Sequence, residues 1–198
     1  MQGPPRDRPA VPGIEMSLAW SAIINATPSW PATAGAVAWA FAMLALTPVA
    51  DWIASRWIRK PPNLDVFRQL QQSRTKLIIG IVIAWVLGAF VEELIFRGFV
   101  QQWVEQNLAA SLAPPVATIV AVLVAAIGAG VLHLYQGLRA AVIITQLSVL
   151  FGVLFVLSGR NLWSVFLCHG IYDTVAFIRF ANRQSRYSKD SVEDEAPQ

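Results

Sequence analysis

Six ionisable side chains lie within segments of this sequence that are otherwise apolar, and their types are those of a hydrolytic site. The six are Glu92, Glu93, Arg97, His133, His169 and Asp173. An ionisable group near the centre of a bilayer costs at least ~2.5–3.5 kcal/mol, so such groups usually serve a function. Carboxylates and histidines can activate a water molecule and stabilise an oxyanion, and an arginine can neutralise a buried carboxylate. These residues are therefore the candidates for catalytic chemistry.

Helical spacing separates the two neighbouring glutamates. At about 100° per residue, Glu93 and Arg97 lie about 40° apart on one face, whereas Glu92 points about 100° away from Glu93. Arg97 can therefore neutralise Glu93, although a solvated salt bridge at a helix end is an alternative interpretation of that pair. Glu92 is left as a separate carboxylate facing another surface, where it could act as a general base.

The neighbouring residues indicate a role for His169 more clearly than for His133. His169 and Asp173 are four residues apart, so they share a helix face and predict a polar surface inside a bundle. An interhelical hydrogen-bonding pair that only holds helices together is the alternative. His133 fits a histidine at the membrane interface as well as it fits a functional site. The sequence contains no His-Glu-x-x-His run and no Gly-x-Ser-x-Gly elbow, so it shows neither a zincin nor a serine-hydrolase motif.

The segments that hold these residues predict an all-α, polytopic transmembrane helix bundle. Of the 198 residues, 56% are hydrophobic and only 14% are charged, whereas roughly 25% are charged in a typical soluble domain. A soluble fold of this size could not bury so much apolar surface, so a soluble enzyme is nearly excluded. A helix of ~20 residues crosses a ~30 Å hydrocarbon core, and five segments are suitable. These expected spans are residues 32–50, 77–103, 115–135, 140–157 and 162–180.

The chain divides into four parts around these spans. Residues 1–31 form a polar and interfacial segment, in which residues 18–26 could be an interfacial helix or a sixth span. Residues 32–74 hold the first span and a basic connection, and residues 75–181 hold the bundle that carries the six ionisable side chains. Residues 182–198 are polar and are expected to be disordered.

Basic residues favour one orientation of a multi-pass protein in the cell membrane. Six of them lie in residues 51–76 and none lies in residues 98–114, so the first connection and the C-terminus are expected in the cytoplasm. Leu64, Phe67 and Leu70 have the spacing of a surface-lying amphipathic helix. The basic residues form no continuous stripe, so the lipid bilayer is an expected partner and nucleic acid is not.

Three short motifs follow one another on successive apolar segments. They are Glu92-Glu93-Leu94-Ile95-Phe96-Arg97, His133-Leu134-Tyr135-Gln136-Gly137, and Gly159-Arg160-Asn161-Leu162-Trp163 leading to His169-Gly170-Ile171-Tyr172-Asp173. In their order they resemble the CPBP family (CAAX proteases and bacteriocin-processing enzymes, also called Abi proteins), which is related to the type II CAAX prenyl proteases. The resemblance covers about residues 75–181.

The resemblance implies an intramembrane endopeptidase that acts on membrane-associated or lipid-modified peptides or proteins. It implies that Glu92 and His133 bind and activate the attacking water. It further implies that His169 and Asp173 stabilise the oxyanion of the tetrahedral intermediate. A catalytically inactive member that serves as an immunity, assembly or transport factor is the alternative. The residues that the resemblance assigns to support of the site are Glu93 and Arg97.

Two positions depart from the family pattern. Ala129 stands four residues before His133, where the family usually has Phe, so the packing of the pocket should differ. Asp173 stands where the third motif often has Asn. An ionised carboxylate cannot donate a hydrogen bond, so Asp173 must be protonated, orient His169 or bind a metal. Metalloprotease and glutamic-protease mechanisms both remain open. The possible ligands of a divalent metal such as zinc are Glu92, His133, His169 and Asp173.

Depth in the membrane sets a geometric requirement. Glu92 and His169 fall at similar depths in the expected spans, whereas His133 falls near the inner end of its segment. For the three to meet, we expect a tilted, broken or re-entrant segment that lines a cavity. The glycines at 128 and 130 should allow close helix packing.

Overall fold

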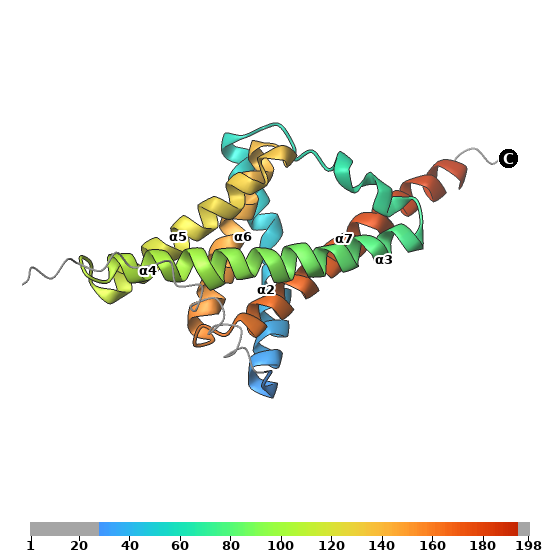
Figure 1. The fold of residues 1–198 in the computed structure, drawn as a ribbon. Coiled ribbons are helices and arrows are strands. Elements are labelled where there is room, and N and C mark those ends of the chain that lie inside the picture. Colours follow the sequence, from blue (N-terminus) through green and yellow to red (C-terminus); the bar gives the residue numbers. More distant parts are fainter. Residues whose placement is uncertain (1–27, 194–198) are drawn as a thin grey trace, which may run out of the picture.

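The computed structural model describes residues 28–193, with side chains through residue 182, and every element in this part of the chain is a helix (Figure 1). The all-α prediction is confirmed. The interfacial helix expected at residues 18–26 lies outside the described residues. The elements are α2 (Trp30–Trp57), η1 (Asp65–Gln71), α3 (Arg74–Ile83), η2 (Ala84–Glu92), η3 (Leu94–Gln101), α4 (Gln102–Leu108), α5 (Pro114–Leu132), η4 (Leu134–Gln136), α6 (Leu138–Leu157) and α7 (Leu162–Glu193).

One long helix crosses the rest of the molecule. The elements α3, η2, η3 and α4 follow each other without a break and form a helix over Arg74–Leu108, which runs across α2 and obliquely to α5 in Figure 1. Ser73 caps its start, since the Ser73 hydroxyl accepts a hydrogen bond from the Lys76 backbone N–H at 3.2 Å. The helix is longer than the expected 77–103. Its central elements η2 and η3 are π-helical, so each turn is wider than the α-helical turn assumed from the sequence.

Helix α2 is also longer than the expected 32–50, and it packs along α7. Its first turn contains Pro31 and is capped by Ser29, whose hydroxyl accepts from Ala32 N–H at 3.3 Å. Small residues on its buried face allow close approach. Farther along, the Thr47 hydroxyl lies 2.9 Å from the Tyr172 hydroxyl. The two helices therefore form one side of the bundle, and their packing positions His169 and Asp173 of the third motif, which lie on α7.

Helix α5 ends before the site residue that the sequence placed inside a span. The prediction extended this span to residue 135, but α5 stops at Leu132 and His133 is the residue that caps it, with φ −97° and ψ 11°. A new helix begins after Gly137, whose φ of +96° is accessible to glycine at little cost. Gly130 lies so close to α6 that a Cβ there would overlap the Thr145 side chain. The glycines of α5 do permit close packing, as expected from the sequence.

Helix α7 begins after a tight turn and continues to Glu193. Gly159 and Arg160 both have positive φ, 70° and 60°, which reverses the chain direction between α6 and α7. Because α7 extends to Glu193, the first part of the tail expected to be disordered from residue 182 is helical. Residues beyond 193 lie outside the described part.

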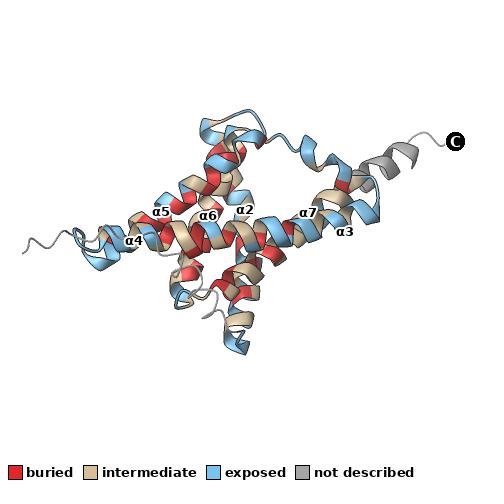
Figure 2. Ribbon diagram, viewed as in Figure 1, coloured by how far each residue is buried: buried red, intermediate tan, exposed pale blue. Residues whose placement is uncertain are grey.

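Four helices are long and apolar enough, by length and composition, to cross a membrane: Trp30–Trp57, Arg74–Leu108, Pro114–Leu132 and Leu138–Leu157. The fifth expected span, residues 162–180, is helical as part of α7 but is not among the four, since polar residues such as His169 and Asp173 lower its hydropathy. Figure 2 shows the buried residues gathered where the long helix crosses the other helices. Large apolar side chains such as Ile78, Val82 and Val86 point outward and are more than half exposed. This is the pattern of a multi-pass membrane protein.

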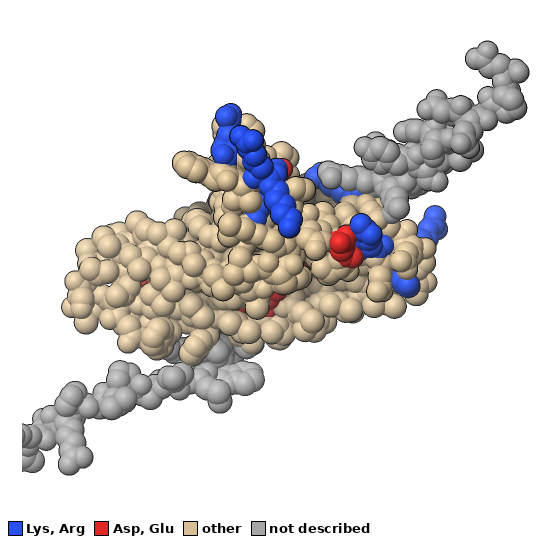
Figure 3. Space-filling model, turned by 90° about the horizontal axis from the view of Figure 1, so that it is seen from above, with Lys and Arg blue, Asp and Glu red and all other residues tan. Residues whose placement is uncertain are grey.

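The helix ends fall into two groups. The connection after α2 contacts η4 through Asn63 N–H and Gln136 C=O at 2.7 Å. At the other end, the Arg160 guanidinium pairs with Glu105 at 2.5 Å, which joins the α6–α7 turn to α4. The basic residues of 51–76 and Arg139 lie on elements of the first group, and Figure 3 shows Lys and Arg on the upper edge and at the right end, beside a broad surface with few charges.

The amphipathic helix expected at Leu64, Phe67 and Leu70 is the short 3-10 helix η1. Leu70 is buried, and the Phe67 ring packs on Phe177 of α7 with ring centroids 5.3 Å apart. Leu64, the residue before the helix, is 39% exposed, so the rest of the molecule covers this apolar face only in part, and the surface-lying arrangement stays a prediction.

Candidate active site

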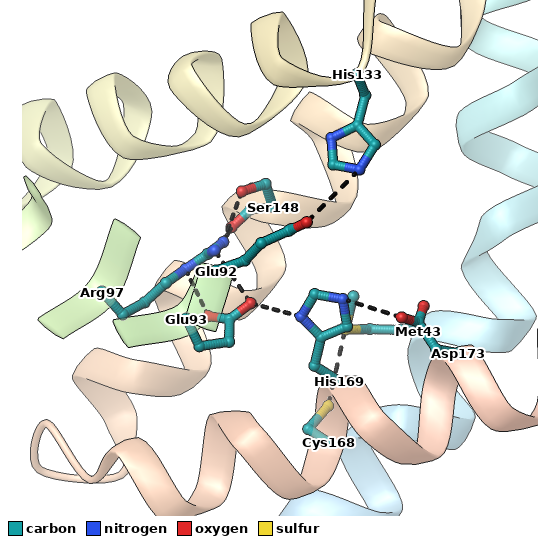
Figure 4. A network of polar contacts seen from close by, with 9 residues as sticks. All are labelled: Met43, Glu92, Glu93, Arg97, His133, Ser148, Cys168, His169 and Asp173. Atoms are coloured by element: carbon teal, nitrogen blue, oxygen red, sulfur yellow. Dashed lines mark hydrogen bonds and ion pairs between the residues drawn. The ribbon is translucent and has the colours of Figure 1, made fainter. Parts of the chain in front are cut away.

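The six ionisable residues come together where the long helix passes between α5, α6 and α7 (Figure 4). Glu92 and Glu93 lie at the junction of η2 and η3, and Arg97 follows on η3. His133 lies at the end of α5, and His169 with Asp173 lies on α7. Two side chains of α6 that the sequence did not indicate, Ser148 and Phe151, complete the cluster.

Glu93 is the centre of a buried network. Its side chain is 0% exposed and that of Arg97 is 2% exposed. Arg97 Nη1 donates to Glu93 Oε1 at 3.1 Å, and Arg97 Nε lies 3.1 Å from Glu93 Oε2. Arg97 Nη2 donates to both the backbone oxygen and the hydroxyl of Ser148 at 2.6 Å. A buried arginine needs several acceptors. In the sequence, Ser148 is only one of three polar residues in the fourth apolar segment, with Thr145 and Gln146, so the spacing alone does not identify it as the partner of Arg97.

His169 joins this network to Asp173. Its Nδ1 lies 2.7 Å from Glu93 Oε1, and its Nε2 lies 3.4 Å from Asp173 Oδ2. The first distance is that of a strong hydrogen bond, and the second is longer than a good one. The His169 ring stacks on Phe151 with centroids 4.6 Å apart, and the Arg97 guanidinium lies 5.5 Å from the same ring. The predicted shared face of His169 and Asp173 is confirmed.

The Glu93 contact with His169 corrects the sequence interpretation. That interpretation gave Glu93 a single partner, Arg97, because only local spacing was considered. The structure gives Glu93 a second partner 76 residues away in the chain. Since Glu93 is an acceptor, His169 Nδ1 is the donor, and the orientation of the imidazole depends directly on this carboxylate.

Glu92 and His133 form a second, more open pair. Glu92 Oε1 lies 4.0 Å from His133 Nε2, and the two side chains are 24% and 16% exposed. His133 Nδ1 lies 2.8 Å from the Ala129 carbonyl oxygen. A carbonyl can only accept, so Nδ1 carries the proton, and Nε2 of the neutral ring has a free lone pair. Figure 4 shows Glu92 between His133 and the Glu93–His169 contact.

The sequence predicted that His133 lies at a different depth in the membrane from Glu92 and His169. These residues can nevertheless meet, because the long helix runs obliquely to α5. Phe96 of η3 packs on Ala125 and Ala129 of α5, and Glu92 lies one turn earlier, so it reaches the end of α5. Neither a re-entrant nor a broken segment is needed within α5. Ala129, at the position usually occupied by Phe, leaves the space that Phe96 fills.

A metal ion does not fit this arrangement. In the described part of the chain, no group of three or more His, Cys, Asp or Glu side chains is placed to hold one. Both ring nitrogens of His169 face carboxylates, those of Glu93 and Asp173, whereas His133 faces Glu92. The side chains are thus divided into separate contacts rather than directed at one point, and we derive no step through a metal.

Comparison with known proteins gives one family match. Residues 74–175 match the model of the family described as type II CAAX prenyl endopeptidase Rce1-like. This range covers just over half of the chain and contains all six ionisable residues of the site. No match was found among curated proteins or among solved structures.

Proposed function

Because the chain belongs to the Rce1-like family of type II CAAX prenyl endopeptidases, we propose that it is an intramembrane endopeptidase. Its substrates are membrane-associated or lipid-modified peptides or proteins, in which it hydrolyses one peptide bond. The residues that we assign to the reaction are Glu92, His133 and His169, and Asp173 lies beside His169 Nε2 at 3.4 Å and helps to orient it.

The separation of Glu92 and His133 carries the proposal. Their facing atoms are 4.0 Å apart, which is too long for a direct hydrogen bond and leaves room for one water that contacts both. The carboxylate and the His133 Nε2 lone pair are both acceptors, so each can take one of the two hydrogens of that water. This arrangement directs a lone pair of the water oxygen toward a substrate.

Hydrolysis then needs one proton to move twice. Glu92 takes a proton from the water as the water oxygen bonds to the carbonyl carbon of the substrate. The carbonyl oxygen becomes negative, and His169 Nε2 stabilises it when the ring carries protons on both nitrogens. Glu92 gives its proton to the leaving nitrogen as the C–N bond breaks. Glu93 and Arg97 do not exchange protons in this scheme and hold His169 in place.

Access through the membrane follows from the position of the site. The site lies among helices that are apolar enough to span a bilayer, so its substrates should be cut close to a membrane anchor or to the end of a span. A soluble folded protein cannot bring an extended backbone into that region without losing its hydrogen bonds. We therefore propose the bilayer and an anchored peptide as the partners.

The carboxylate of Glu92 can be tested against a matched carboxylate on the same long helix. Wild type, Glu92→Gln and Glu105→Gln would be purified in detergent and incubated with a library of membrane-anchored peptides, with new N-termini read by mass spectrometry. We expect wild type and Glu105→Gln to cleave, since Glu105 lies at the far end beside Arg160. Glu92→Gln should lose activity by about 10²–10⁴-fold. Cleavage by Glu92→Gln at the wild-type rate would refute the assignment.

Orientation in the cell membrane is proposed from the basic residues. The connection that contains Ser73 should lie in the cytoplasm with the C-terminus, and Ser111 should lie outside. Both serines are exposed. Single cysteines at these positions in a Cys168→Ser background would be treated with an impermeant thiol reagent on intact cells. Labelling of Ser111→Cys alone is expected, and labelling of Ser73→Cys alone would invert the orientation.

A further inference from the structure

The indole ring of Trp85 lies flat on helix α7 beside the site. Trp85 is the second residue of η2, and Gly170 directly follows His169 on α7. A Cβ at residue 170 would lie 2.5 Å from Trp85 Cδ2 and Cε3 and 2.6 Å from Cε2. Cδ2 is bonded to both other atoms inside the fused ring system, so a point almost equally close to all three lies over the face of the ring. The indole therefore occupies the place where a side chain at residue 170 would begin.

A hydrogen bond fixes the indole in this position. Trp85 Nε1–H donates to Thr174 Oγ1 at 3.0 Å, and the Thr174 hydroxyl donates to the Gly170 carbonyl oxygen at 2.7 Å. The indole thus contacts two points of α7 that are one turn apart, and Asp173 lies between them in the chain. Hydrocarbon offers an N–H group no other acceptor, so this bond is costly to break within a bilayer.

The close approach at Gly170 brings η2 and α7 together next to the site. Glu93 follows Trp85 by eight residues on the same long helix, and η2 packs directly on α7. His169 Nδ1 lies 2.7 Å from Glu93 Oε1, and a hydrogen bond weakens when its atoms move apart by a few tenths of an ångström. Because His169 and Gly170 are neighbours on α7, a wider separation of the helices at Gly170 would lengthen this bond.

The contact differs from the other aromatic contact between the same two elements. The rings of Phe90 on η2 and Phe166 on α7 have centroids 5.1 Å apart and are tilted by 47°, and two side chains can adjust to each other. Trp85 lies instead on the backbone of a glycine, with no side chain beneath it to adjust. The ring on Gly170 therefore sets the distance between the two helices.

We propose that Trp85 is a positioning residue, which acts through Gly170 and Thr174 to hold His169 at hydrogen-bond distance from Glu93. This inference rests on the proposed endopeptidase function and adds a residue outside the three sequence motifs. The partners of Trp85 lie 85 and 89 residues away in the chain, so motif spacing does not indicate its role.

Trp85→Leu tests this role against Trp103→Leu, a matched control on the same long helix. Trp103 lies on α4 and is 46% exposed, compared with 36% for Trp85. We expect Trp85→Leu to lower kcat by about 10²-fold, as a catalytic group displaced by about 1 Å does, whereas KM should change much less. Trp85→Phe keeps a ring and loses the N–H group, so its kcat should lie between those of Trp85→Leu and wild type. Wild-type kcat in Trp85→Leu would overturn the proposal, and so would an equal loss in Trp103→Leu.

The contact with Gly170 can be tested by compensation. Gly170→Ala places a methyl group where the ring lies, so kcat should fall at least as far as in Trp85→Leu. The smaller leucine leaves room for that methyl group, so the double variant should have a higher kcat than Gly170→Ala alone. Losses that simply multiply would show that the two residues act independently and would overturn the proposal. If Gly170→Ala does not fold, recovery of folded protein in the double variant is the expected compensation, and failure of both to fold would contradict it.

A further measurement follows the hydrogen bond between His169 and Glu93 and does not depend on cleavage. The protein has two histidines, so selective ¹⁵N labelling, with His133→Gln for assignment, identifies the His169 ring in NMR spectra of the micelle-bound protein. A short bond to a carboxylate moves the Nδ1 proton resonance far downfield. We expect this resonance in wild type and in Trp103→Leu, and an upfield shift or its loss in Trp85→Leu. An unchanged resonance in Trp85→Leu would overturn the inference.

The two kinds of measurement separate the two claims. If wild type cleaves nothing in the peptide library, the proposed function fails, and the Nδ1 resonance still decides whether Trp85 holds His169 in place. If wild type cleaves and Trp85→Leu keeps both the rate and the resonance of wild type, the inference fails and the endopeptidase function stands.

Discussion

The two neighbouring glutamates lie in opposite environments although they are consecutive in the chain. Glu93 is fully buried, and its carboxylate is engaged by Arg97 and His169. Glu92 is about a quarter exposed, and its nearest ionic partner, His133, is 4.0 Å away. The Glu93 carboxylate has its partners supplied by the protein, whereas the Glu92 carboxylate is partly exposed and has no direct hydrogen bond to another described side chain.

Under the proposed function, this difference divides the site into a supporting half, around Glu93, and a reacting half, around Glu92. A buried charge is tolerated only when its partners are in place, so removing one partner is costly. A general base needs the reverse, because its lone pair must remain available for the proton of a water. The buried half and the open half should therefore respond differently to the same chemical change.

The largest expected effect is a difference in stability between the Glu93→Gln and Glu92→Gln variants. Glu93→Gln leaves the Arg97 guanidinium buried without a counter-charge, so the free energy of unfolding should fall by about 3–5 kcal/mol. Glu92→Gln should change it by less than about 0.5 kcal/mol. Thermal and denaturant unfolding in one detergent would measure both. Equal losses would mean that the two carboxylates are not divided between structure and reaction.

Asp173→Asn should have a smaller effect, on activity. Asp173 Oδ2 lies 3.4 Å from His169 Nε2, a weak contact that an amide of the same shape can replace. An amide can also donate a hydrogen bond to an oxyanion, which an ionised carboxylate cannot. We expect kcat to change by less than about tenfold, or about 1.4 kcal/mol. A folded Asp173→Asn protein without activity would show that the carboxylate itself takes part.

Phe151→Leu tests the ring that supports the buried half. Phe151 stacks on His169 and lies under the Arg97 guanidinium, whereas Phe155 on the same helix is buried in the apolar core. Both substitutions remove similar apolar area. Phe151→Leu should therefore lower the free energy of unfolding by about 0.5–1.5 kcal/mol more than Phe155→Leu does, because it also removes ring contacts. Identical unfolding curves for the two variants would argue against a special role for this ring.

Treatment with a metal chelator should have no effect on cleavage. The two histidines face different carboxylates and share no common point with them. Activity of wild type would be measured before and after dialysis against a strong chelator, with re-addition of zinc. Loss of activity that zinc restores would show that the side chains rearrange into a ligand set, and would end the distinction between an open half and a buried half.

From the sequence alone, the class of protein and the residues of the candidate site could be predicted. A chain with 56% hydrophobic residues has to bury its surface in lipid, and the resemblance of three motifs pointed to the family that the match over residues 74–175 shows. The contacts predicted from spacing, Glu93 with Arg97 and His169 with Asp173, are local. They depend only on a helix returning to the same face after about four residues.

The contacts between residues far apart in the chain could not be predicted, because they depend on how the helices cross. Ser148 lies 51 residues from Arg97, and Glu93 lies 76 residues from His169, so no spacing rule links them. The π-helical turns at the two glutamates and the end of α5 before His133 were also not readable from hydropathy. The physical reason is that lipid and helix surfaces are equally apolar, so hydropathy shows that helices enter the membrane and not how they cross. Small residues and buried polar contacts decide the crossing, and with it the position of every side chain in the candidate site.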